Sequence, residues 1–186
     1  MTGTGAAGGV APAGGSAAPQ HLVVMGVSGC GKTVLASLLA GRLDHRFCEA
    51  DDIHPPANIE KMSRGVPLTD ADRRPWLEAL GAWMGRQAAE GRSTVMACSA
   101  LRRDYRDILR SGTSGEVAFV HLDGDPELVM HRMNAREHFM PGSLLRSQLD
   151  TLEPLGPDEL GVRIRLDQTP EEELAEVLAW LPARSA

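Results

Sequence analysis

The chain has 186 residues, of which 42% are hydrophobic and 24% charged, which suffices for one domain with a buried core. Its formal net charge of −6 argues against a general nucleic-acid-binding protein, because such proteins are usually basic. No apolar run approaches the roughly 20 residues of a membrane-spanning helix. We therefore expect no membrane partner. The three cysteines lack metal-ligand spacing and cannot all pair with one another, so we expect a reducing, cytoplasmic location.

The beginning of the chain differs in composition from the rest. The first 20 residues hold six Gly, six Ala, two Pro and no charged residue. Such a segment buries too little apolar surface to offset the entropy of ordering it. We therefore expect a disordered tail at residues 1–20 and a single domain at residues 21–186.

Strand-like and helix-like patterns alternate through that domain. Short runs rich in β-branched residues predict strands, and apolar residues at helical spacing predict helices. In chain order, the predicted elements are strand 21–25, helix 33–43, strand 47–50, helix 70–90, strand 94–98, helix 102–110, strand 117–122, helix 126–136, helix 143–152, strand 162–166 and helix 170–181. This alternation predicts an α/β fold with a parallel sheet and helices on both faces.

The first strand leads into a complete phosphate-loop pattern, G-x-x-x-x-G-K-[ST]. The segment consists of Gly26, Val27, Ser28, Gly29, Cys30, Gly31, Lys32 and Thr33. It lies between a predicted strand and a predicted helix, which is the context that the motif requires. Backbone N–H groups and the helix N-terminus favour phosphate there, Lys32 can reach the β- and γ-phosphates, and the Thr33 hydroxyl can bind Mg²⁺. The segment predicts binding of a nucleoside triphosphate.

Among phosphate-loop proteins, the chain favours a small kinase. A GTP switch protein needs an Asn-Lys-x-Asp motif, and neither of the two lysines follows an asparagine. A motor ATPase needs a much longer chain. A kinase with a mobile lid fits the length that remains after the tail.

Three acids gather at the end of the second predicted strand, at Glu49, Asp51 and Asp52. Ligands of open α/β sheets bind at the carboxyl ends of strands, so these acids should face the phosphate loop. We expect Asp51 to orient the acceptor hydroxyl and to support Mg²⁺ through water. A solvated acidic turn is the alternative interpretation.

Several stretches together resemble the gluconokinases, small ATP-dependent kinases of gluconate. They are Asp51-Asp52-Ile53-His54-Pro55, Asn58-Ile59-Glu60-Lys61-Met62, Gly65-Val66-Pro67-Leu68, Asp70, Asp72-Arg73, Pro75-Trp76-Leu77, Cys98-Ser99-Ala100-Leu101, Tyr105-Arg106, His138-Phe139-Met140-Pro141, Leu144-Leu145, Ser147-Gln148 and Thr151-Leu152-Glu153-Pro154. The resemblance covers about residues 22–181. Many families share the phosphate loop, so the other stretches carry most of its specificity.

The resemblance implies a three-layer fold similar to those of shikimate and adenylate kinases. Its parts would be a five-stranded parallel sheet flanked by helices, a helical substrate-binding insert at about residues 53–90 and a lid at about residues 137–152. It implies phosphorylation of D-gluconate to 6-phospho-D-gluconate with ATP and Mg²⁺, and it suggests a homodimer.

The implied substrate is a linear polyol that ends in a carboxylate, so its site needs hydrogen-bond donors and a cation. The insert offers donors of this type at His54, Asn58, Lys61 and Arg73. After strand 94–98, we expect Ser99 to bond the substrate and Arg102 to meet a carboxylate or phosphate. Each residue alone also fits a structural role, so the set carries the prediction.

The lid contributes further candidates. Arg132 and Arg136 are four residues apart and share a helix face. By similarity to related kinases, Arg132 would lie over the adenine, and Arg136 would stabilise charge on the transferring phosphoryl group. His138 and Gln148 would close over the substrate. Only Glu137 separates Arg136 from His138, where the family often has two residues, and this leaves open which arginine reaches the γ-phosphate.

The predicted catalytic residues are therefore Lys32, Asp51 and Arg136. Glu49 stands where the family often has Asp, and we assign it no catalytic role. Two alternatives remain open: a kinase of the same fold that uses shikimate or another sugar acid, and a nucleotide-binding regulatory protein without transfer activity.

Overall fold

Five parallel strands form the centre of the fold, in the order β2-β3-β1-β4-β5. The computed structural model describes residues 20–134 and 142–181. Within these ranges the strands are β1 (Gln20–Met25), β2 (Arg46–Glu49), β3 (Thr94–Ala97), β4 (Glu116–Asp123) and β5 (Gly161–Arg165). This sheet confirms the predicted fold class, and β1 begins one residue before the predicted start of the domain.

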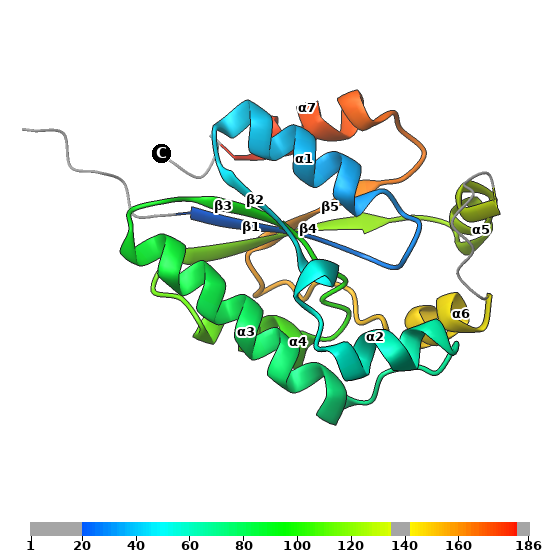
Figure 1. The fold of residues 1–186 in the computed structure, drawn as a ribbon. Helices are drawn as coiled ribbons and strands as arrows, with labels where there is room; N and C mark the ends of the chain where they lie inside the picture. The colour runs from blue at the N-terminus through cyan, green and yellow to red at the C-terminus, as the bar shows by residue number, and fades with distance from the viewer. Residues whose placement is uncertain (1–19, 135–141, 182–186) are drawn as a thin grey trace, which may run out of the picture.

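Helices cover both faces of the sheet (Figure 1). One face carries α1 (Lys32–Leu43) and α7 (Pro170–Trp180). The opposite face carries α3 (Asp70–Ala89) and α4 (Arg103–Ser111). Two hydrophobic clusters lie between these layers, and alternate residues of each central strand point into one or the other. Because both faces are buried, the central strands are continuous apolar runs.

The remaining helices gather at one end of the molecule, beyond the carboxyl ends of the strands (Figure 1). They are α2 (Pro56–Ser63), α5 (Pro126–Asn134) and α6 (Gly142–Thr151), and a short 3₁₀ helix, η1 (Ala50–Ile53), leads from β2 toward α2. The predicted insert, residues 53–90, contains α2 and α3. Of the predicted lid, the structure describes α6, and residues 137–141 lie outside the described ranges.

Most elements follow the predicted order, but α2 does not appear in the hydrophobic pattern. Asn58 is the one buried residue of α2, so the helix has no apolar face to detect.

Among the described residues, the structure contains no helix with the length and apolar character to cross a membrane.

Candidate active site

The phosphate loop connects β1 to α1, and two of its positions require glycine. Gly26 has a φ of 141°, and a Cβ atom there would lie 2.9 Å from Cys30 Sγ and from the Leu122 carbonyl oxygen. Gly31 has a φ of 107° at the start of α1. Residues with a side chain rarely adopt such positive φ angles, so the two glycines permit the loop conformation. Cys30 is buried within the loop, and burial raises the pKa of its thiol.

Two side chains of the loop donate hydrogen bonds to oxygen atoms of the protein. Lys32 Nζ donates to the Val27 carbonyl oxygen at 3.0 Å. Thr33 Oγ1 donates to Glu49 Oε2 at 2.7 Å, so the acid at the end of β2 lies against the predicted magnesium ligand. Burial raises the pKa of Glu49, and the hydrogen bond from Thr33 opposes that shift.

Magnesium prefers hard oxygen ligands, and the Thr33 hydroxyl and the neighbouring Glu49 carboxylate fit that preference. Among the described residues, no three His, Cys, Asp or Glu side chains gather as a ready metal cluster. The ion would therefore rely on phosphate oxygens and water for its other ligands, as in other phosphate-loop enzymes.

A cavity lies between the phosphate loop, the insert and α6, and seven of the predicted residues line it. They are Ser28, Lys32, Asp51, His54, Arg73, Ser99 and Gln148. The rest of the described lining consists of Met62, Pro67, Leu68, Trp76, Leu101 and Ser147. The cavity thus brings nucleotide-binding and substrate-binding candidates from distant segments into one space.

His54 is held rigidly on the wall of this cavity. Its ring stacks on Trp76, with the ring centroids 4.0 Å apart, and Trp76 Nε1 donates to the Ala50 carbonyl oxygen at 2.9 Å. Asn58 Nδ2 lies 3.3 Å from His54 Nδ1 and donates to the Asp72 carbonyl oxygen. Because an amide NH₂ group only donates, His54 Nδ1 is an acceptor and its proton lies on Nε2. That atom faces Asp51 Oδ1 at 3.8 Å.

Three predicted substrate ligands lie outside the cavity lining. Asn58 is buried behind His54, as described above. Lys61 Nζ donates to Asp72 Oδ2 at 2.7 Å and joins α2 to the N-terminal cap of α3. Arg102 pairs with Asp70 at 2.9 Å. In this structure the three residues support neighbouring elements.

Helix α6, the described part of the predicted lid, contacts the phosphate loop. Gln148 Oε1, on α6, accepts from the Ser28 N–H at 2.6 Å, and Gln148 Nε2 lies 3.4 Å from Ser28 Oγ. Arg132 belongs to α5, but its side chain lies outside the described structure, as do residues 136 and 138. The predicted roles of Arg132, Arg136 and His138 stay predictions.

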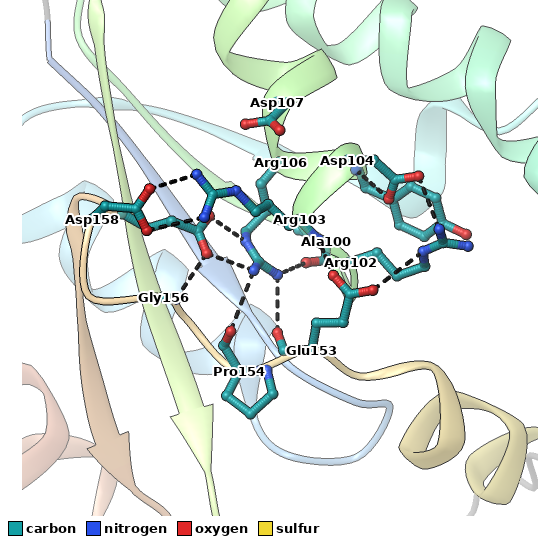
Figure 2. Close-up of polar contacts among 12 residues, drawn as sticks. Ala100, Arg102, Arg103, Asp104, Arg106, Asp107, Glu153, Pro154, Gly156 and Asp158 are labelled. Carbon is teal, nitrogen blue, oxygen red and sulfur yellow. Dashed lines mark hydrogen bonds and ion pairs between the residues drawn. The ribbon is translucent and has the colours of Figure 1, made fainter.

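A buried arginine joins the segment after α6 to the loop after β3 (Figure 2). Arg106, on α4, has no exposed side-chain surface and pairs with Glu159, whose side chain is 1% exposed. Its Nε and Nη2 atoms each donate to Glu159 at 2.7 Å. Nη1 donates to the Ala100 and Glu153 carbonyl oxygens, and Nη2 to that of Pro154. The five bonds join the segment after α6 to the loop that follows Ser99.

Glu153 reinforces the same junction. Its N–H donates to the Leu101 carbonyl oxygen at 2.7 Å, and its Oε2 accepts from the Arg103 N–H at 2.8 Å. The carboxylate thereby satisfies an N–H group at the start of α4, where an anion is favoured by the helix dipole. Both bonds fix the segment after α6 against the loop that leads into α4.

Sequence reasoning missed two features of the candidate site. The apolar cavity residues, such as Leu68 and Leu101, look like ordinary core residues in the sequence. The sequence also does not show that Glu49 contacts Thr33, although an acid two residues before Asp51 is a usable signal. In both cases the missing information is the direction of the side chain.

Comparisons with known sequences and structures all point to one family. Residues 22–155 match the AAA_33 family, an AAA domain. A gluconokinase of Gluconobacter oxydans (strain 621H) is 50% identical over 166 residues, which cover 89% of this chain and 93% of that protein. The crystal structure of a sugar kinase from Janibacter sp. HTCC2649 is 53% identical, with a TM-score of 0.85 over 88% of this chain and 95% of that chain.

A gluconokinase structure from Sinorhizobium meliloti 1021 is 45% identical, with a TM-score of 0.81 over 91% of this chain and 94% of that chain. Shikimate kinase from Aquifex aeolicus is 15% identical with a TM-score of 0.56 over 89% of this chain and 98% of that chain, which shows a shared fold. Given such identity over most of its length, the chain belongs to the gluconokinase family of phosphate-loop kinases.

Proposed function

We propose that this protein transfers the γ-phosphoryl group of ATP to the 6-hydroxyl of D-gluconate, giving ADP and 6-phospho-D-gluconate. One observation carries the proposal: Lys32 of the phosphate loop, Asp51 and Arg73 line the same cavity. Lys32 provides a cation for the phosphates, Asp51 a candidate base, and Arg73 a second cation. Together they suit an acidic acceptor bound beside a nucleotide. The names of relatives at 45–50% identity support gluconate as that acceptor.

On the nucleotide side, the loop N–H groups and Lys32 bind the phosphates. Thr33 would hold Mg²⁺ directly, with Glu49 and Asp51 acting through water. When bound, the ion neutralises charge on the β- and γ-phosphates. The direct bond from Thr33 to Glu49 supports this arrangement, because the two side chains already reach one another.

On the acceptor side, Asp51 orients the hydroxyl and accepts its proton as the new oxygen–phosphorus bond forms and the bond to the ADP oxygen breaks. The hydrogen bonds between Gln148 and Ser28 hold α6 over the loop, and a closed lid excludes water that would otherwise consume ATP. His54, Arg73 and Ser99 supply donors for the polyol and its carboxylate. Catalysis is then mainly positioning and charge neutralisation.

Other expectations from the sequence stay predictions. They are the placement of Arg132 over the adenine, the action of Arg136 on the transferring phosphoryl group, the closure of His138 over the substrate, a homodimer and a cytoplasmic location.

The test is ADP release from ATP and Mg²⁺, measured without acceptor and with D-gluconate, shikimate or a panel of related sugar acids. The Lys32→Ala variant measures the background release of ADP that does not depend on the active site. Stimulation by gluconate above all other acids supports the proposal. Stimulation by another acid instead would show that this acid, and not gluconate, is the substrate. If the protein bound nucleotide but no acid stimulated ADP release, a regulatory protein would be favoured.

A further inference from the structure

Arg73 is the cation of the cavity that remains for an acidic substrate. In the described lining, the charged basic side chains are Lys32 and Arg73, and Lys32 belongs to the phosphate loop. The His54 ring is engaged on the cavity wall, because it stacks on Trp76 and its Nδ1 atom lies 3.3 Å from Asn58 Nδ2. The Arg73 side chain is 17% exposed, so it is shielded from bulk water but open to the cavity.

The hydrogen bonds of Arg73 differ from those of the structural arginine on α4. Arg106 donates five hydrogen bonds and is saturated. Arg73 donates one among the described residues, from Nη1 to the Tyr105 hydroxyl at 3.2 Å. A guanidinium has five N–H groups, so Arg73 keeps donors for a carboxylate fork.

Tyr105 contacts that guanidinium through both its hydroxyl and its ring. Its side chain is buried in α4, and its hydroxyl donates to Asp70 Oδ1 at 2.5 Å. A phenol has one proton, so donation to Asp70 turns an oxygen lone pair toward Arg73. The Arg73 Cζ atom also lies 5.6 Å from the centre of the Tyr105 ring, within the range of a cation–π contact.

Asp70 is itself fixed on its other side. Its second oxygen accepts from Arg102 Nη1 at 2.9 Å, whereas its ion pair with Arg73 spans 3.8 Å. The carboxylate therefore orients the Tyr105 hydroxyl without occupying the hydrogen-bond donors of Arg73.

We propose that Tyr105, with its hydroxyl oriented by Asp70, is a positioning residue that presents Arg73 to the carboxylate of the sugar-acid substrate. This inference rests on the proposed function. It assigns the recognition of the acid group to the base of the insert, where α3 meets α4. The polyol end would then lie toward Asp51 and the phosphate loop.

The test is Tyr105→Phe, which keeps the ring and removes the hydroxyl. We expect the KM for gluconate to rise roughly tenfold, the loss of one hydrogen bond to a charged group, while kcat and the KM for ATP change by less than about twofold. Arg103→Gln is the matched control, because it removes an exposed ion pair with Asp158 from the same helix and should leave all three constants unchanged. Thermal unfolding of both variants checks that the fold is retained.

A double-mutant cycle separates positioning from a general structural effect. In an Arg73→Gln background, Tyr105→Phe should lower kcat/KM by no more than about twofold further, since its partner is already absent. A full tenfold loss in that background, or a wild-type KM in Tyr105→Phe, would overturn the inference. If the wild-type enzyme prefers another sugar acid, the cycle is run with that acid, and if no acid stimulates it, the proposed function itself fails.

Discussion

Glu159→Gln is expected to destabilise the protein severely, because it leaves a buried guanidinium without its counter-charge. Both oxygens of Glu159 accept hydrogen bonds: Oε1 from Arg106 and Arg110, and Oε2 from Arg106 and the Gly156 N–H. Glutamine has the same shape, but its NH₂ group would face at least two donors whichever way it turned. Arg106 has no exposed side-chain surface, so bulk water cannot replace the missing carboxylate.

The size of the loss follows from these contacts. Removing one partner of a buried ion pair costs about 3–5 kcal/mol, out of a total stability of about 5–15 kcal/mol for a typical domain. For a domain of this size, that loss lowers the unfolding midpoint by roughly 10 °C. The expected change is therefore far outside the error of ordinary denaturation experiments.

Urea unfolding at pH 7, followed by circular dichroism, measures the loss. Asp158→Asn is the matched control: the same kind of substitution one residue away, in an exposed ion pair with Arg103 at 2.6 Å. Solvent screens that pair, so its loss should change the stability little. If Glu159→Gln destabilised the protein no more than Asp158→Asn does, the assigned role of the buried pair would be refuted.

The pH dependence provides a second check on Glu159. Burial alone would raise the pKa of its carboxyl, but hydrogen bonds from Arg106, the Gly156 N–H and Arg110 lower it from 4.5 to about 2. A depressed pKa in the folded state contributes stability that is fully present above the unfolded-state pKa and is lost as the pH falls toward the folded-state pKa. The difference in stability between wild type and Glu159→Gln should therefore shrink as the pH falls from about 5 to about 3, with a slope no steeper than the uptake of one proton allows.

Three substitutions test the proposed chemistry. Lys32→Ala should lower kcat by about a thousandfold with an unchanged unfolding midpoint, and retained activity would contradict the phosphate-loop assignment. Asp51→Asn should lower kcat by about a hundredfold or more while the KM for ATP changes little, and a pure binding defect would remove Asp51 from the chemistry. Glu49→Gln should raise the Mg²⁺ concentration for half-maximal activity by about tenfold, because Glu49 bonds the Thr33 hydroxyl; an unchanged requirement would exclude Glu49 from the metal site.

The fold was largely predictable because its signals are local. Both faces of the central strands are buried, so strands such as β1 are apolar runs, and the phosphate loop marks the junction of β1 with α1. α2 escaped prediction because its contacts are polar and its buried residue is Asn58. The pairing of Arg106 with Glu159 also escaped, since 53 residues separate them and nothing near either residue in the sequence indicates the other.

The stretch from His54 to Met62 shows why a specific sequence motif need not consist of ligands alone. His54 and Met62 line the cavity, whereas Asn58 and Lys61 face α3, where both contact Asp72. Asn58 and Lys61 are three residues apart on α2 and share one of its faces, whereas His54 lies before the helix begins. A substrate wall made from a polar helix needs a second polar layer to hold it, because α2 has little apolar surface to pack. The motif is therefore specific because it encodes both the cavity wall and the residues that support it. Substitution of Asn58 should disturb substrate binding by displacing His54, and not by loss of a direct contact with the substrate.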